Sequence, residues 1–185
     1  RGTTSIGSRC FLMIGSHIAH DCVVGNDVIL TNQAVLGGHA QVGDFVILGG
    51  LAAVQQRARI GAHAFVGGLT GVTQDVVPYV MVTGRWGALS GLNVIGLRRR
   101  GFSRDEIRAI REAYKLFFAP NSGTRAERLD RLVAKFGTEP ALAPFIEFVR
   151  ETGNKPLAHP RSAGDAGQRE GNSAGPGEER DDDGG

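Results

Sequence analysis

Residues 4–72 read TSIGSRCFLMIGSHIAHDCVVGNDVILTNQAVLGGHAQVGDFVILGGLAAVQQRARIGAHAFVGGLTGV. An aliphatic side chain recurs at every sixth residue of this stretch, and a small or β-branched side chain lies two residues before each one. A helix cannot keep a period of six on one face, because its apolar positions recur every three or four residues. Short strands joined by sharp turns can keep it, so each hexad predicts one flat side of a solenoid. The aliphatic positions are Ile6, Leu12, Ile18, Val24, Leu30, Leu36, Val42, Leu48, Val54, Ile60, Val66 and Val72.

Three such sides close a triangular coil of eighteen residues, and successive coils stack at roughly 4.8 Å, as neighbouring strands do. We therefore predict a mainly β fold, with a parallel β-helix over residues 1–78. The small side chains should fill the narrow inward positions of each coil. Glycine directly follows the aliphatic residue in seven of the hexads. We interpret these glycines as supplying the backbone freedom that a sharp corner needs.

The six-residue pattern ends before residue 79, and we predict connecting loops over residues 79–102. Helix signals follow. Two capping boxes, SRDE at 103–106 and TRAE at 124–127, each precede an amphipathic run, and a third helix is expected near 141–151. We predict that residues 103–155 form a small α-helical C-terminal domain that caps the solenoid.

Charge is distributed unevenly along the chain. Residues 162–185 hold seven acidic residues and two arginines, a net charge of −5, and no aliphatic side chain larger than alanine. Such a segment cannot bury enough apolar surface to fold, so we predict a disordered acidic tail. The whole chain has a net charge of +2, which leaves about +7 on the rest. A basic body favours an acidic partner, such as a nucleotide diphosphate or an acidic carrier protein, over nucleic acid.

Hydrophobicity and cysteine placement indicate where in the cell the protein is located. No apolar run is long enough to span a bilayer, so we expect no stable membrane insertion. Cys10 and Cys22 both lie on the small inward grid, which is typical of buried thiols in a reducing compartment. We therefore predict a cytoplasmic protein. Because the chain starts at Arg1, inside the repeat, we expect it to be a fragment or to lack upstream coils.

Stacking at eighteen-residue intervals brings polar residues together at one corner of the predicted coil. A histidine is the side chain best suited to accept a proton near neutral pH, and a neighbouring carboxylate can orient it. A glycine one coil above leaves a backbone N–H open to a developing oxyanion. The two predicted columns are His20, Gly38 and Gln56, and Asp21, His39 and Arg57, with His17 just before them.

No serine or cysteine in this patch is placed as a nucleophile. The columns therefore favour direct acyl transfer, with a histidine as general base, over a covalent intermediate. Two alternatives stay open. His17, His20 and His39 could bind zinc, as three histidines do in the hexapeptide-repeat carbonic anhydrases, which would make a hydratase. The chain could also be a catalytically silent trimeric scaffold.

The hexad grid resembles the hexapeptide-repeat acyltransferase superfamily, which implies a left-handed coil and a homotrimer. The motifs HIAHDC at 17–22 and GLRRRGFS at 96–103 are more specific. With them, roughly residues 1–155 are similar to the acyl-carrier-protein–UDP-N-acetylglucosamine O-acyltransferases, which begin lipid A synthesis. The resemblance implies transfer of a β-hydroxyacyl chain from the phosphopantetheine of acyl carrier protein to the sugar 3-hydroxyl. It implies no metal and no resident cofactor.

The same resemblance assigns roles to individual residues. It implies that His20 is the general base, that Asp21 orients His20, and that the Gly38 amide is the oxyanion donor. Gly68 would set the acyl-chain length. One departure is Gln55, where the family pattern has a histidine. The remaining positions that the resemblance places on the substrates or the carrier protein are His17, His39, Gln56, Asn93, Arg99 and Arg100.

Overall fold

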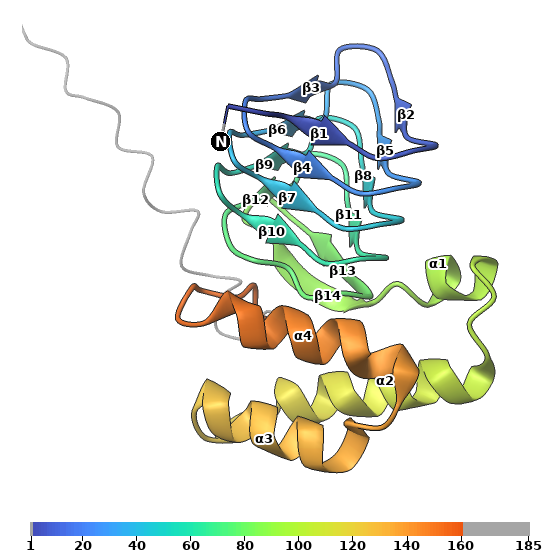
Figure 1. The fold of residues 1–185 in the computed structure, drawn as a ribbon, viewed down its shortest axis with the longest axis vertical. Coiled ribbons are helices and arrows are strands. Elements are labelled where there is room, and N and C mark those ends of the chain that lie inside the picture. Colours follow the sequence, from blue (N-terminus) through green and yellow to red (C-terminus); the bar gives the residue numbers. More distant parts are fainter. Residues whose placement is uncertain (1, 161–185) are drawn as a thin grey trace, which may run out of the picture.

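The computed structural model describes residues 2–160, and the predicted disordered tail at 162–185 lies outside these described residues. The described chain is a triangular column of stacked coils with a layer of helices packed below its lower end (Figure 1). The prediction of a mainly β solenoid followed by a small helical domain is confirmed.

Two-residue strands form the three faces of the column. Face A contains β1 (Ser5–Ile6), β4 (Val23–Val24), β7 (Gln41–Val42) and β10 (Arg59–Ile60). Face B contains β2 (Phe11–Leu12), β5 (Ile29–Leu30), β8 (Ile47–Leu48) and β11 (Phe65–Val66), and continues into β13 (Val80–Thr83) and β14 (Ala88–Leu92). Face C contains β3 (His17–Ile18), β6 (Val35–Leu36), β9 (Ala53–Val54) and β12 (Gly71–Val72).

Neighbouring strands of the two-residue series pair in parallel with a register of eighteen residues. On face A, for example, Ser5 pairs with Val23, Val23 with Gln41, and Gln41 with Arg59. The register predicted from the hexad grid is therefore confirmed. It places residues i, i+18 and i+36 in one column of the folded protein.

The core of the column is made by the two inward grids. From Val24 to Val72 every aliphatic position is at most 3% exposed, and the small residues between them, such as Ala34 and Ala52, are fully buried. The first coil differs, because Ile6 and Leu12 are 46% and 43% exposed. Within residues 2–160 no coil lies above these two side chains to cover their upper side.

The glycines that follow the aliphatic residues serve a different purpose from the predicted one. None of them has positive φ. The left-handed conformation falls two residues later, and non-glycine residues such as Asp27 (φ 56) and His39 (φ 61) adopt it. Glycine is required by the close approach of successive coils. A Cβ at Gly37 would lie 2.7 Å from the Gln56 amide nitrogen, and one at Gly61 would lie 2.4 Å from the nitrogen of Pro78.

Residues 79–102 are more regular than the predicted connecting loops. β13 extends face B by pairing in parallel with β11, and then turns back into the antiparallel strand β14. A short helix, α1 (Val94–Arg99), follows. The side chain of Asn93 caps it by accepting a hydrogen bond from the Gly96 amide at 3.1 Å. The hairpin lies at the lower end of the solenoid, and α1 lies to one side of this end (Figure 1).

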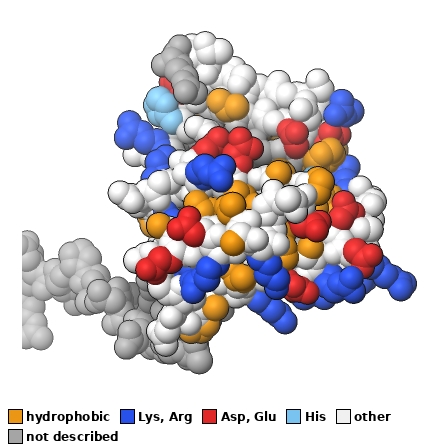
Figure 2. All heavy atoms as spheres, turned by 60° about the horizontal axis from the view of Figure 1, so that its bottom comes forward, with side chains coloured by type: hydrophobic (Ala, Val, Ile, Leu, Met, Phe, Trp, Pro, Cys, Tyr) orange, Lys and Arg blue, Asp and Glu red, His pale blue; other side chains and the backbone are white. Residues whose placement is uncertain are grey.

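The helical domain contains α2 (Arg104–Phe117), α3 (Arg125–Phe136), the 3-10 turn η1 (Pro140–Leu142) and α4 (Ala143–Thr152). Both predicted capping boxes are present, at Ser103 with Glu106 and at Thr124 with Glu127. On the surface of this end, basic and acidic side chains are interspersed with hydrophobic ones (Figure 2). No helix within residues 2–160 has the length and apolarity that crossing a membrane requires.

Asp75 joins the last coil to the end of the described chain. Its Oδ1 accepts a hydrogen bond from the Arg59 amide at 2.9 Å, its backbone carbonyl accepts one from the Ala158 amide at 2.8 Å, and its side chain is almost fully buried. Among the described residues, Oδ2 has no hydrogen-bond partner. Burial raises the pKa of this carboxyl, against the backbone hydrogen bond from Arg59 and the nearby charges of Lys155, Arg59 and Arg125, which lower it.

We predict that Asp75→Asn raises the melting temperature at neutral pH. Burial gives the folded carboxyl a higher pKa than the unfolded one. Its contribution to stability is therefore full below about pH 4, the unfolded value, and is lost as the pH rises from there through the raised pKa of the folded carboxyl. An asparagine keeps an acceptor for Arg59 and cannot ionise. Thermal melts of wild type and Asp75→Asn between pH 4 and 8 should diverge as the pH rises, and curves that remain parallel would contradict this account.

Candidate active site

The column has three corners, and each follows one face. The His20 corner (residues 19–22, 37–40 and 55–58) follows face C, and the Arg100 corner (residues 25–28, 43–46 and 61–64) follows face A. The Gly68 corner (residues 31–34, 49–52 and 67–70) follows face B. The names are taken from the predicted site residue that lies at each corner. One full side of the triangle separates each corner from the next.

His20 and Asp21 form a hydrogen-bonded pair at the first of these corners. The Nδ1 atom of His20 lies 2.9 Å from Oδ2 of Asp21. The other carboxylate oxygen, Oδ1, accepts a hydrogen bond from the Gly2 amide at 2.6 Å. The bond from His20 and then the bond from Gly2 hold the pKa of Asp21 far below its usual range, so the carboxylate is ionised at neutral pH. It therefore fixes the His20 ring with Nδ1 as the hydrogen donor, which leaves Nε2 as a proton acceptor.

The His20 ring lies directly against the backbone of Gly38. A Cβ at Gly38 would lie 2.6 Å from Nε2 of His20, so only glycine leaves room for the imidazole there. The Gly38 carbonyl accepts a hydrogen bond from the Arg57 amide at 2.9 Å, while the Gly38 amide donates none within residues 2–160. The corner therefore combines a proton acceptor with a nearby unused backbone donor, as predicted from the column.

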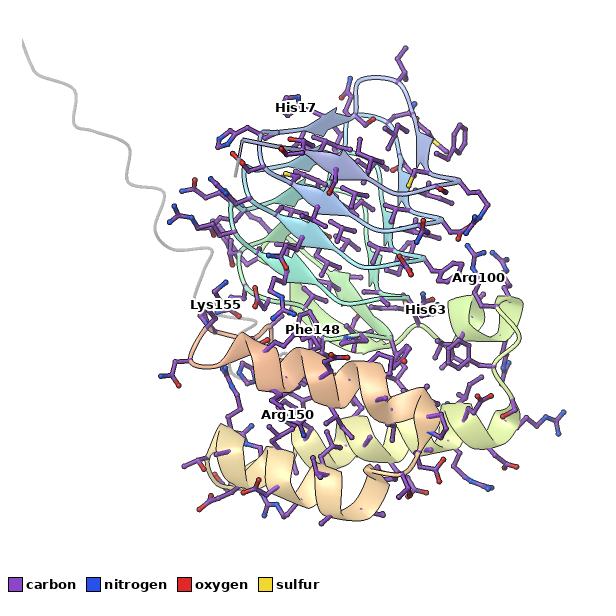
Figure 3. The ribbon with its side chains drawn as sticks, viewed as in Figure 1. His17, His63, Arg100, Phe148, Arg150 and Lys155 are labelled. Carbon is purple, nitrogen blue, oxygen red and sulfur yellow. The ribbon has the colours of Figure 1, made fainter. Side chains whose placement is uncertain are left out.

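His39 completes the cluster. Its Nε2 lies 4.0 Å from Oδ2 of Asp21, and its ring meets the His20 ring edge-on with centroids 5.1 Å apart. Gln56 occupies the same corner one coil beyond Gly38 and is exposed. His17 lies on β3, just before the corner, and its side chain is exposed near the upper end of the column (Figure 3).

This arrangement does not assemble the three-histidine zinc site that the sequence left open. The ligand atoms that approach one another to within 4.8 Å belong to His20, Asp21 and His39, and His17 is not among them. The next side chain in the column of Asp21 and His39 is the cation Arg57. A bound zinc ion would add a second positive charge beside Arg57, which is electrostatically unfavourable.

Gly68 lies at a different corner from His20. A Cβ at Gly68 would approach the carbonyl oxygen of Gly50 to 3.2 Å, so the two glycines form a shallow strip on the column. Leu51 and Leu69, which follow these glycines, are 53% and 72% exposed. The strip is therefore apolar and open, as a surface for an acyl chain would be. The sequence pattern did not indicate these leucines, because they lie outside the two inward grids.

Asn93, Arg99 and Arg100 lie at the third corner. The Arg100 guanidinium lies over the Phe45 ring, with Cζ 4.6 Å from the centroid. Arg99 ends α1 and is exposed. The Asn93 side chain is nearly buried, because its Nδ2 donates to the His63 carbonyl at 2.9 Å while its Oδ1 caps α1. In this structure Asn93 positions α1 and does not face solvent.

The repeat region and the cap each match a known family. Residues 3–38 match the bacterial transferase hexapeptide repeat, and residues 75–157 match the second domain of UDP-N-acetylglucosamine O-acyltransferase. A hexapeptide β-helix with a histidine–aspartate pair on an exposed corner defines a transferase of the hexapeptide-repeat class. The chain is also 56% identical, over 160 residues, to the acyl-[acyl-carrier-protein]–UDP-N-acetylglucosamine O-acyltransferase of Caulobacter vibrioides. It belongs to the UDP-N-acetylglucosamine O-acyltransferase family, and the resemblance seen in the sequence is confirmed.

Solved structures agree with this assignment. The enzyme of Moraxella catarrhalis superposes with a TM-score of 0.80 at 40% identity, over 85% of this chain and 60% of its own. The Arabidopsis enzyme superposes with a TM-score of 0.77 at 34% identity, over 85% of this chain and 56% of its own. The Caulobacter alignment likewise covers 86% of this chain and 60% of the relative. The chain thus spans about 60% of the length of these relatives.

Proposed function

We propose that this protein transfers a β-hydroxyacyl chain from acyl carrier protein to the 3-hydroxyl of UDP-N-acetylglucosamine, the first step of lipid A synthesis. The observation that carries the proposal is the hydrogen-bonded His20–Asp21 pair lying against the unused amide of Gly38. The family relationship supports the choice of substrates, because the relatives are named for them.

The geometry supports direct transfer. Nε2 of His20 takes the proton of the sugar hydroxyl as its oxygen attacks the thioester carbonyl. The Gly38 amide stabilises the oxyanion of the tetrahedral intermediate. When that intermediate collapses, a C–O ester bond has formed and the C–S bond breaks, and protonated His20 returns its proton to the leaving thiolate. Asp21 stays ionised and stabilises the imidazolium. No metal or resident cofactor takes part, because the acyl group arrives on the phosphopantetheine of the carrier protein.

A complete site requires more than one chain. His20, Gly68 and Arg100 lie at three different corners of the column, so they cannot all contact one substrate molecule within a protomer. In a closed cyclic trimer one surface of each chain meets a different surface of the next chain, so residues from two corners can share one site. We therefore propose a homotrimer, in which His17, His20, His39 and Gln56 of one chain face Arg99 and Arg100 of the next.

Complementation of inactive variants tests both the reaction and the shared site. His20→Ala and the double variant Arg99→Ala/Arg100→Ala would be co-expressed with different tags, and mixed trimers purified over both tags. A mixed trimer has one interface with both parts intact, so it should show about one third of wild-type transfer while each parent is nearly inactive. The parents mixed after separate purification are the control. Mixed trimers no more active than their parents would show that the site lies within one chain, and a wild type without transfer would refute the function.

Gly68 is proposed to limit the acyl chain. Gly68→Met should shift preference towards shorter β-hydroxyacyl donors, because its side chain would fill the strip beside Gly50. Competition between donors of different length measures the shift in kcat/KM. Leu69→Met changes the neighbouring side chain without adding bulk over the glycine strip and is the matched control. Unchanged donor preference in Gly68→Met would show that the acyl chain ends elsewhere.

The remaining partners follow from charge and composition. Arg99 and Arg100 are exposed cations suited to the nucleotide diphosphate and to an acidic carrier protein. We propose no nucleic-acid partner. A cytoplasmic location is supported by the free thiols of Cys10 and Cys22.

A further inference from the structure

His63 lies at the centre of an aromatic cluster that the proposed reaction does not use. Its ring stacks on Phe45, with centroids 4.7 Å apart and planes 16° apart, and also on Tyr79, at 5.8 Å and 27°. Phe102 meets His63 edge-on at 5.1 Å. Phe45, His63 and Tyr79 all have positive φ and occupy the same position in successive coils, so their rings form a continuous column at the Arg100 corner.

His63 contacts both ends of the segment that carries Arg100. Its carbonyl accepts the hydrogen bond from Nδ2 of Asn93, at the start of α1. Its ring contacts Phe102, two residues after Arg100. Between these two points the Arg100 guanidinium lies over the face of Phe45, the ring that stacks on His63. Figure 3 shows His63 and Arg100 on the same side of the column. The segment that carries Arg100 is therefore packed against this ring stack at its start, at Arg100 itself and at its end.

The charges around His63 favour its neutral form. Burial lowers the pKa of His63, the nearby charge of Arg100 lowers it further, and Asp44 acts in the opposite direction. From the other packed elements, Asp27 faces Arg100 and Glu106 faces Tyr79. A proton on His63 would place a second cation in the column that holds Arg100, so protonation and the present position of Arg100 oppose each other.

We propose that His63 is a positioning residue, which holds Arg100 in place for the phosphates of the sugar nucleotide and releases it on protonation. This inference rests on the proposed function for the identity of the ligand. The consequence is that the protein should bind UDP-N-acetylglucosamine more weakly in acid. The loss should set in below about pH 6.5, the ordinary value for histidine, because the folded protein resists protonation of His63.

The first experiment observes Arg100 directly and needs no activity. In protein labelled with ¹⁵N at arginine, the Nε–H signal of Arg100, assigned by its loss in Arg100→Lys, should be shifted by the Phe45 ring at pH 7.5. It should move towards the free-arginine position at pH 5.5 in wild type, and at both pH values in His63→Ala. His63→Phe keeps a stacking ring and cannot titrate, so its signal should stay in place. His159→Phe, which removes a histidine beside Phe118, is the matched control and should behave as wild type.

The second experiment measures the Kd of UDP-N-acetylglucosamine by calorimetry at the same two pH values. A lost charge-assisted contact should weaken wild-type binding about ten-fold or more in acid relative to His63→Phe. Comparing the two proteins at each pH cancels the effects of pH that arise elsewhere in the protein. If His63→Phe shows the same loss of affinity in acid and the same shift of the Arg100 signal as wild type, His63 does not position Arg100. If the Arg100 signals behave as expected and wild type does not bind the nucleotide at pH 7.5, the positioning role stands and the proposed function fails.

Discussion

His20→Ala should reduce acyl transfer by roughly 10²–10⁴-fold, the usual cost of removing a general base. The effect should fall on kcat, because His20 is proposed to act on the reacting hydroxyl. The fold should be unaffected, since the His20 side chain is 73% exposed and, within residues 2–160, its hydrogen bond joins it to the adjacent Asp21. Steady-state kinetics with the acyl-carrier donor, together with a thermal melt, would measure both.

His159→Ala is a suitable control for this variant. His159 is also an exposed histidine, and it contacts Phe118 in the helical domain, away from the corners. Its removal should leave turnover near the wild-type value. A His20→Ala protein that retains more than about a tenth of wild-type turnover would remove His20 from the role of general base.

Gly49→Ala should strongly destabilise the solenoid, whereas Gly50→Ala should not. A Cβ at Gly49 would lie 2.4 Å from the Gly68 amide nitrogen, which belongs to the next coil and cannot move without breaking the stack. Overpacking of this kind costs about 1–3 kcal/mol, and more where only backbone can yield. At Gly50 the nearest atom is the Asn32 carbonyl oxygen at 3.5 Å, an ordinary contact.

The comparison of these neighbours isolates the packing effect. Neither glycine has positive φ, so backbone strain is the same for both replacements. Denaturant unfolding of the two variants should show a large fall in midpoint for Gly49→Ala, and a change within about 0.5 kcal/mol for Gly50→Ala. Equal midpoints would mean that the coils can separate to admit a methyl group, and that the spacing does not select glycine.

The repeat allowed much of the candidate site to be predicted from sequence. A strict period of six fixes the eighteen-residue register, and that register alone places His20 beside Gly38 and Asp21 beside His39. The two capping boxes could be predicted equally well, because the residues that form each box lie three positions apart in the sequence. These predictions depend on local spacing, so they required no knowledge of distant contacts.

The predictions that failed involve distant contacts. The glycines of the hexads were assigned to corner geometry, but they are needed because the next coil approaches closely. The hairpin of β13 and β14 and the short helix α1 were missed. The hairpin needs the free edge of β11, and α1 depends on a hydrogen bond from Asn93 to His63, thirty residues earlier.

The columns of stacked side chains follow from the amino-acid sequence alone, because side chains at a fixed period must stack once the period is kept. The same period also places Gly68 at a different corner from His20, because the two residues lie two coils and two hexads apart. Only the tertiary structure places Arg100, which lies outside the repeat, at the third corner. Only the tertiary structure shows that Arg100 lies over Phe45, because α1 docks there through Asn93 and Phe102. The repeat forms the same local contacts in every coil, so one spacing rule predicts all of them. The docking of α1 depends on contacts between particular side chains far apart in the sequence, which no repeated spacing indicates.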